Sequence, residues 1–279
     1  MNYSLEKSSD GTIKIIFEKG HHCVIIPQKL GYTLCVSSQV GCALGCKFCY
    51  TAKMGFLANL TAQEIVDQYV VAKQVLEEER KEGDQKEIRG FVFMGMGEPF
   101  MNSKQVYEAC DRLNQEFGFS YKKMTISTSG LIKEMRKFIV LKKPMKLALS
   151  LHSPNEVTRK SIMPIALHNQ FEELIEVCNL YSKTYKDPIM IEYLMIKDLT
   201  DSNDDLDTLL NSGLDKGTYI NLIPLNGEMD LNGKLYFSPE MQTVLKWKEK
   251  IMKNQYKCFI RSTMGEDIQA ACGMLKSDN

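Results

Sequence analysis

Seven short apolar runs, separated by amphipathic stretches, constrain the fold of this chain more than any other feature of its sequence. The stretches carry apolar residues at the 3.6-residue period of a helix, and one of them opens with a capping box formed by Thr61 and Glu64. One predicted helix starts at Thr61. The other predicted helices cover roughly 103–117, 130–139, 169–185, 203–213 and 238–253. The predicted strands cover 32–38, 90–95, 123–129, 146–152, 189–196, 219–225 and 257–263.

Strands that alternate with helices predict right-handed βαβ units and a parallel sheet. About six such units favour an α/β fold of the partial (β/α)6, TIM-like barrel type over a small open sheet, and 279 residues suit one barrel. The functional site of such a barrel forms at the C-terminal ends of its strands. Short strands around the turn at Lys19-Gly20 predict a β-hairpin extension over residues 1–30, followed by the barrel over 31–279, in one structural unit.

Composition bears on the partners and the compartment. The chain has no apolar run of membrane-spanning length, and its start lacks the basic-then-apolar pattern of a signal peptide, so a cytoplasmic protein is expected. Lys and Arg number 35, and so do Asp and Glu, whereas dedicated nucleic-acid binders are usually basic. Local patches decide contact with RNA, so the balance of charge lowers the expectation of an RNA partner without excluding it.

The segment VGCALGCKFCYT places Cys42, Cys46 and Cys49 directly after the first predicted strand of the barrel. In a reducing compartment such thiols are more often metal ligands, catalytic groups or core residues than disulfides. A [4Fe–4S] cluster normally has four cysteine ligands, so three would leave one iron open to a small molecule, as catalytic zinc keeps an open position. The alternative is a four-cysteine zinc site with Cys35, although only one C-x2-C hook is present.

With Phe48 before its last cysteine, the C-x3-C-x2-C motif resembles the signature of radical S-adenosylmethionine (SAM) enzymes. Further segments follow in the order seen in the RlmN/Cfr family of RNA adenine methylsynthases, and the resemblance covers about residues 10–275. These segments are TLCVSSQVGCALGCKFC, NLTAQEI, FMGMGEP, ISTSG, SLHSPNEVTRKSIMPI, INLIP and AACG. The resemblance implies a radical SAM barrel and a radical SAM methyltransferase that modifies RNA.

The resemblance also implies the cofactors and the residues that hold them. Cys42, Cys46 and Cys49 would bind the [4Fe–4S] cluster, whose open iron would chelate the amino and carboxylate groups of SAM. Two SAM molecules would be used per turnover. The residues matching SAM contacts are Gly97, Glu98, Ser127, Ser150, Leu151, His152 and Asn226, with Glu98 beside the ammonium and Gly95 and Gly97 allowing close backbone approach. Each of these residues also has an ordinary structural interpretation. The segment with Gly97 and Glu98 could be a simple turn, His152 a hydrogen-bonded histidine at a strand end, and Ser127 and Asn226 helix caps.

Two further cysteines match the catalytic cysteines of the family. One SAM would methylate Cys272, and an adenosyl radical from the second SAM would take hydrogen from that methyl group. The carbon radical would add to adenine, and Cys35 would then attack the Cys272 sulfur, releasing the methylated base and leaving a transient disulfide. For Cys23, Cys110, Cys178 and Cys258 the ordinary role of a small buried residue is expected.

The chain departs from the family pattern at several positions. His22 stands where the family has a glutamate proton acceptor, and histidine can serve as a base near neutral pH; His21 could substitute by a shift of one residue. Ala58 stands where the family has a basic residue, and Met264 stands where the RlmN branch, but not the Cfr branch, has an arginine; the accessory N-terminal domain of the family is not expected here. The remaining candidate basic contacts are Lys122, Lys123, Lys133, Arg136, Lys137, Lys142, Lys143, Arg159 and Lys160, most of them expected to be ordinary solvated charges.

The predicted partners are an RNA substrate, rRNA or tRNA, and an external electron donor such as flavodoxin, with the chain as a monomer. The segment at residues 97–99 reads GEP rather than GEA, which favours the RlmN branch of the family and therefore carbon 2 of adenine over carbon 8. One alternative is an enzyme of the same mechanism with a smaller or non-ribosomal substrate. The other is a non-enzymatic protein that binds a cluster or zinc for structural reasons.

Overall fold

A computed structural model describes residues 2–79 and 86–276 of the chain. The chain forms two compact units, which are described separately below. The first comprises residues 1–43, 49–127 and 263–279, and the second comprises 44–48 and 128–262. The predicted division into an extension over 1–30 and a barrel over 31–279 stays a prediction. Residues 1, 80–85 and 277–279 of these two predicted parts lie outside the described residues. Within the described ranges, no helix is both long and apolar enough to cross a membrane.

The first unit begins with antiparallel strands and continues with parallel ones. Its strands are β1 (Tyr3–Lys7), β2 (Ile13–Phe17), β3 (His22–Gln28), β4 (Gly31–Cys35), β7 (Ile88–Phe93) and β8 (Met124–Thr128), paired in that order. Pairing is antiparallel up to β4 and parallel from β4 onward. The predicted turn at Lys19-Gly20 is confirmed, with Gly20 at a φ of 88°. β1 was not predicted, because this edge strand is only half-buried and its apolar pattern is weak.

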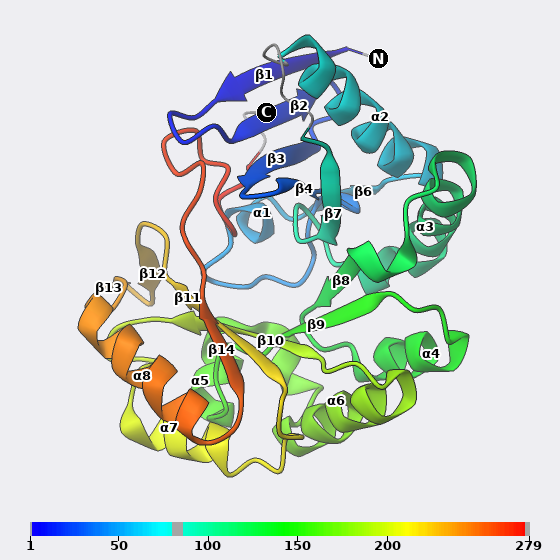
Figure 1. Ribbon diagram of the computed structural model, residues 1–279. Coiled ribbons are helices and arrows are strands. Elements are labelled where there is room, and N and C mark those ends of the chain that lie inside the picture. The colour runs from blue at the N-terminus through cyan, green and yellow to red at the C-terminus, as the bar shows by residue number, and fades with distance from the viewer. Residues whose placement is uncertain (1, 80–85, 277–279) are drawn as a thin grey trace. The chain divides into compact units, whose positions relative to one another are not determined.

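Two helices cover these strands. They are α2 (Ala62–Glu78) and α3 (Ser103–Phe117), which contact each other along the sheet (Figure 1). The predicted capping box is confirmed, because the Thr61 hydroxyl accepts from the Glu64 N–H and the Glu64 carboxylate accepts from the Thr61 N–H. The smaller elements are α1 (Tyr50–Lys53), the 3-10 helices η1 (Pro99–Asn102) and η2 (Tyr121–Lys123), and the paired strands β5 (Gln39–Gly41) and β6 (Phe56–Asn59).

The second unit is built on parallel strands. They are β9 (Lys146–Ser150), β10 (Met190–Met195), β11 (Tyr219–Pro224) and β14 (Lys257–Ile260), paired in that order. Its helices are α4 (Ile132–Leu141), α5 (Glu156–Ile162), η3 (Pro164–Leu167), α6 (Phe171–Tyr185), α7 (Asn203–Leu210) and α8 (Met241–Lys253). The predicted strands and helices are therefore confirmed. The short helices α5 and η3 and the hairpin of β12 (Met229–Leu231) and β13 (Lys234–Tyr236) were not predicted, because they span too few residues to show a period.

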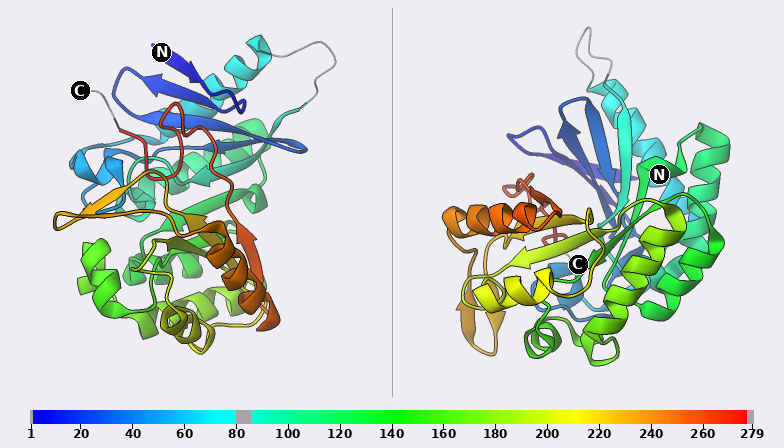
Figure 2. Two further views of the ribbon diagram at one scale, coloured as in Figure 1. Left: turned by 90° about the vertical axis from the view of Figure 1, so that its left-hand side faces the viewer. Right: turned by 60° about the horizontal axis from the view of Figure 1, so that its bottom comes forward.

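Aromatic packing attaches the helices of the second unit. The Tyr193 ring of β10 lies 5.2 Å from the Trp247 ring of α8, and α8 also contacts β14 (Figure 2). Phe138 of α4 stacks with Tyr181 of α6 at 6.3 Å. Tyr193 points toward α8, so the alternate side chains of β10, among them Glu192, face the other side of the sheet.

His21 makes folding stability depend on pH. Its ring stacks on Phe17 with centroids 4.5 Å apart, and neither ring nitrogen has a hydrogen-bond partner among the described residues. Burial is the main cause that lowers its pKa to about 4. The unfolded histidine binds its proton near pH 6.5, so the unfolded state holds more protons as pH falls from there toward 4, and stability falls with it.

We expect acidification from pH 7 to pH 4.5 to cost the wild type about 2 kcal/mol more unfolding free energy than it costs His21→Phe, which keeps a stacked ring. Urea unfolding at each pH measures the difference. Equal acid sensitivity of wild type and His21→Phe would contradict the assignment.

Candidate functional site

The cysteine loop follows β5 and depends on a glycine. Gly41 has a φ of 73°, and a Cβ at this position would lie 1.9 Å from the Gly55 carbonyl oxygen. That same oxygen accepts from the Cys42 N–H at 2.8 Å, which closes the loop. Gly45 also has a positive φ, of 69°. The loop's own backbone therefore requires the glycines that the sequence places beside its cysteines.

The three loop cysteines supply thiolate donors suited to iron. Cys42 and Cys46 are buried and Cys49 is half-buried, and none of the nine cysteines, all in the described ranges, is joined in a disulfide. In residues 2–79 and 86–276 no three His, Cys, Asp or Glu side chains are arranged to hold one metal ion. A [4Fe–4S] cluster makes a different demand, because each thiolate binds a separate iron. Three soft ligands within eight residues fit that demand.

Burial raises the pKa of the Cys49 thiol, and proximity to Cys272 raises it further, while hydrogen bonds from Ala52 and Thr51 act the other way. Ligation by iron would favour the thiolate that burial alone disfavours. The Tyr50 N–H donates to the Gly273 carbonyl, so Cys272, from the end of the chain, lies near the cysteine loop within the first unit.

The other part of the loop contacts the predicted SAM segment within the second unit. The Lys47 N–H donates to the Ile162 carbonyl of α5 at 2.9 Å, and the Phe48 ring meets the His152 ring edge-on at 4.9 Å. The aromatic residue of the cysteine motif therefore touches the histidine of the SLH motif. Two motifs that lie about a hundred residues apart in sequence are brought together here.

His152 is held in a strained and neutral state. Its φ is 63°, and its Nδ1 accepts from the Leu194 N–H at 3.1 Å. Burial, then the charge of Arg159, lowers the pKa of His152 to about 3, so the ring is neutral near pH 7. With Nδ1 as acceptor, the proton resides on Nε2, which becomes a fixed donor. Leu151 is fully buried, and Ser150 ends β9 half-buried.

Glu98 ends the loop after β7 in the first unit. It is 3% exposed, and its carboxylate accepts from the Phe100 N–H at 3.2 Å, which caps η1. Gly97 has a φ of 94°, and a Cβ there would lie 2.5 Å from the Gln39 side chain. The glycine is therefore already required by contact with Gln39, in addition to any approach of SAM. Ser127 is buried in β8, and Asn226, after β11 in the second unit, is half-buried.

The segment that carries Cys272 has no regular structure and is fixed by contacts from distant parts of the first unit. Lys14 Nζ donates to the Ile268 carbonyl at 2.6 Å, and the Asp10 carboxylate accepts from the Gly265 N–H at 2.7 Å. The Tyr50 N–H donates to the Gly273 carbonyl at 2.7 Å, and the Thr51 hydroxyl donates to the Leu275 carbonyl at 2.6 Å. Although partial burial acts the other way, the bonds from Gly265 and Thr12 lower the pKa of Asp10 to about 2.

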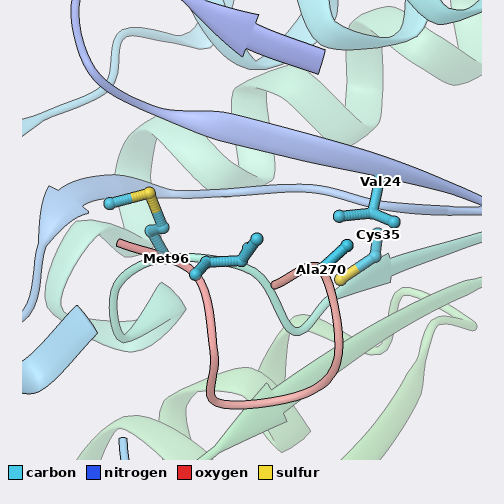
Figure 3. Packing of buried hydrophobic residues seen from close by; sticks show 5 residues of the cluster. Val24, Cys35, Met96 and Ala270 are labelled. Carbon is cyan, nitrogen blue, oxygen red and sulfur yellow. The ribbon is translucent and has the colours of Figure 1, made fainter. Parts of the chain in front are cut away.

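Cys35 lies against the same C-terminal segment. It is 7% exposed and packs with Val24, Met96, Ala270 and Leu275, and Figure 3 shows its sulfur beside Ala270. Ala270 is two residues from Cys272, and Cys272 itself is exposed. The fold therefore brings the segment of one predicted catalytic cysteine onto the strand end of the other.

His22 occupies the same face of the sheet as Cys35. Val24 pairs with Cys35 in register across β3 and β4, so their side chains share a face, and His22 lies two residues before Val24. His22 is 2% exposed, and its carbonyl accepts from the Ser37 hydroxyl at 2.5 Å. The alternative base, His21, is instead stacked on Phe17.

One buried carboxylate, that of Glu192, was not among the functional residues predicted from the sequence. Glu192 lies inside β10, where it is 2% exposed and accepts from the Asn221 side-chain amide at 2.8 Å. The signal was present, because a glutamate interrupts the apolar run IMIEYLMI. A charged residue is rarely buried without a partner or a function.

Comparison with known proteins gives consistent results. The Radical SAM superfamily matches residues 36–210. The chain is 37% identical to the dual-specificity RNA methyltransferase RlmN of Vesicomyosocius okutanii, over 98% of this chain and 75% of the relative. It is also 37% identical to the RlmN of Francisella tularensis subsp. novicida, over 97% and 74% of the two chains. A radical SAM methyltransferase structure from Sphaerobacter thermophilus matches with a TM-score of 0.87 and 32% identity, over 98% and 80%.

Proposed function

Because the chain belongs to the radical SAM superfamily and, within it, to the RlmN family, we propose that it methylates an adenine carbon of RNA through an S-methylcysteine at Cys272. Carbon 2 is preferred over carbon 8. The observation that carries this proposal is the docking of the Cys272 segment, which packs on Cys35 and holds Cys272 near Cys49. A methyl carrier must lie near both a resolving thiol and the source of the radical, and this docking supports both requirements.

The cofactors are those of the superfamily, a [4Fe–4S] cluster and SAM. When bound, the cluster supplies the electron that cleaves SAM and yields an adenosyl radical. Cys42, Cys46 and Cys49 would hold the cluster. The SAM contacts would come from Gly97, Glu98, Ser127, Ser150, Leu151, His152 and Asn226.

The protein groups divide the remaining chemistry among them. The Cys272 thiolate takes a methyl group from SAM, forming a carbon–sulfur bond while S-adenosylhomocysteine leaves. His22, at the family's proton-acceptor position, would accept the proton from the adenine carbon. Cys35 then attacks the Cys272 sulfur: a sulfur–sulfur bond forms, the sulfur–carbon bond breaks, and its electron pair stays on the carbon attached to the base, which takes a proton from water and becomes the methyl group. An external thiol must reduce the resulting disulfide before the next turnover.

The test is the mass of the peptide that contains Cys272, measured after anaerobic reconstitution with iron, sulfide and SAM. We expect a gain of one methyl group on Cys272 that is absent in Cys272→Ala. Cys110→Ala, which alters a buried helix cysteine, is the matched control and should leave the methyl group in place. Absorbance and iron content separate a cluster from zinc. An unmodified Cys272 in a preparation that cleaves SAM would overturn the methyl-carrier mechanism.

The balanced net charge favours a second candidate, an enzyme of the same mechanism with a smaller or non-ribosomal substrate. RNA binding measured against salt distinguishes the two, because phosphate contacts weaken as salt rises. Salt-dependent binding to a structured rRNA or tRNA supports the leading proposal. We further propose a cytoplasmic monomer that receives electrons from an external donor such as flavodoxin.

A further inference from the structure

The N-terminal hairpin of β1 and β2 holds the residues that precede Cys272. Three bonds join Lys14 Nζ to the Ile268 carbonyl at 2.6 Å, the Gly265 N–H to the Asp10 carboxylate at 2.7 Å and the Ser9 N–H to the Asp267 carboxylate at 3.2 Å. Residues 263–276 form no helix or strand, so their backbone groups depend on partners from elsewhere in the chain. The hairpin therefore fixes the position of this segment.

Lys14 is buried for the sake of this contact. It is 6% exposed, and lysine is almost never fully buried unless its charge is paired. The pair is Glu6, which lies opposite Lys14 in register across β1 and β2, with its carboxylate 2.6 Å from Lys14 Nζ. Because Glu6 offsets the charge, the ammonium can donate to the Ile268 carbonyl without leaving an unpaired cation in the protein.

Lys14 also lies in line with Cys35. Lys14 pairs in register with Val24 of β3, and Val24 pairs in register with Cys35 of β4, so the three side chains share one face of the sheet. Ile268 and Ala270 pack on the same core cluster as Cys35. The segment therefore crosses this row from Lys14 to Cys35, and Cys272 follows Ala270 by two residues.

The contacts on both sides of Cys272 limit where its sulfur can lie. Before it, Ile268 is bound to Lys14, and after it, the Gly273 carbonyl accepts from the Tyr50 N–H at 2.7 Å. Without the bond from Lys14, the stretch free to move would extend back to Gly265. A longer free stretch places a given atom in one position less often, and a disulfide forms only when the two cysteines are close and correctly oriented.

We propose that Lys14 is a positioning residue for the two-cysteine chemistry, because its bond to the Ile268 carbonyl keeps Cys272 within reach of Cys35. Asp10 supports it through Gly265. This inference rests on the proposed function, which gives Cys272 and Cys35 their roles. It extends that function to the N-terminal hairpin, whose side chains act on the reaction only through the segment that they hold.

The experiment measures the effective concentration of the Cys35 and Cys272 thiols toward each other. Reconstituted protein is equilibrated without oxygen in buffers of oxidised and reduced glutathione, and the Cys35–Cys272 disulfide is quantified by alkylation and peptide mass. Each disulfide formed converts one oxidised glutathione into two reduced molecules, so the equilibrium ratio gives the effective concentration.

We expect Lys14→Met to lower this effective concentration about 10- to 100-fold, the range for one hydrogen bond from a charged donor. Lys14→Arg keeps a charged donor and should recover most of the loss. The matched control is Lys7→Met, which removes an exposed ion pair with Glu79 from the same hairpin and should behave as wild type. Asp10→Asn, which has one acceptor oxygen fewer, should lower the value even if Lys14→Met fails to fold.

Urea unfolding of the same variants separates positioning from a purely structural role. If Lys14→Met and Asp10→Asn lose stability but keep the wild-type effective concentration, the inference is wrong. An equal loss in Lys7→Met would also overturn it. If wild type methylates Cys272 and the Lys14 and Asp10 variants pair Cys35 with Cys272 as wild type does, this inference alone fails. If these variants lose the pairing but wild type never methylates Cys272, the proposed function alone fails.

Discussion

Cys35→Ala is expected to stop turnover after one reaction and to leave RNA covalently attached to Cys272. The wild-type thiolate would break the bond between the Cys272 sulfur and the methylated base, and alanine has no atom that can do so. Cys35 packs against Ala270 and Leu275, which lie two residues before and three residues after Cys272. Labelled RNA should therefore migrate with the protein on a denaturing gel.

The control is Cys23→Ala, one residue from Val24 in β3. Cys23 lies beside the backbone of Gln68 in α2, on the opposite face from Val24, so its replacement should leave turnover intact. The double variant Cys35→Ala, Cys272→Ala should form no adduct. Continued turnover of Cys35→Ala, or an adduct attached elsewhere than Cys272, would contradict the assigned roles.

Arg159→Leu is expected to destabilise the protein by about 3 to 5 kcal/mol, or to prevent folding. Arg159 is 2% exposed and donates to three backbone carbonyls: Leu151 at 3.2 Å, Asn169 at 3.3 Å and Ser129 at 3.0 Å. Burial lowers its pKa to about 10, with Cys46 acting in the opposite direction, so the guanidinium stays charged at neutral pH. Leucine would remove this donor from all three carbonyl groups, of which that of Leu151 would still accept from the Ser153 N–H at 2.8 Å.

Urea unfolding measures this loss. Arg159→Lys should recover only part of it, because one ammonium cannot reproduce a planar fork that reaches three acceptors. Lys137→Met, at an exposed position on α4, is the control and should change stability by less than about 0.5 kcal/mol. If Arg159→Leu changed the free energy of unfolding by a similarly small amount, the three hydrogen bonds of Arg159 would not contribute to stability as we expect.

Arg159 also corrects the sequence analysis, which grouped it with candidate basic contacts for RNA. In an amphipathic stretch, an arginine three residues from Glu156 looks like any solvated helix charge. Only the carbonyl groups of three separate segments reveal that its charge is internal. It is therefore unavailable to a phosphate, and the other basic residues named with it remain candidates.

The sequence by itself determined the order of strands and helices, the capping box at Thr61 and the spacing of Cys42, Cys46 and Cys49. These features are local, because helical and strand periods and short spacings are set by residues within a few turns of one another. The expectation of a radical SAM enzyme of the RlmN family also rested on ordered local motifs, and the family is confirmed.

The tertiary structure alone decided the contacts between distant residues. Lys14 Nζ donates to the Ile268 carbonyl across 254 positions of sequence, the Phe48 ring meets the His152 ring, and Glu192 is buried inside β10. Local propensity cannot select such contacts, because they depend on the packing of elements whose relative placement no short segment encodes. The environment of the Cys272 segment and the surroundings of the buried Glu192 therefore became visible only in the folded chain.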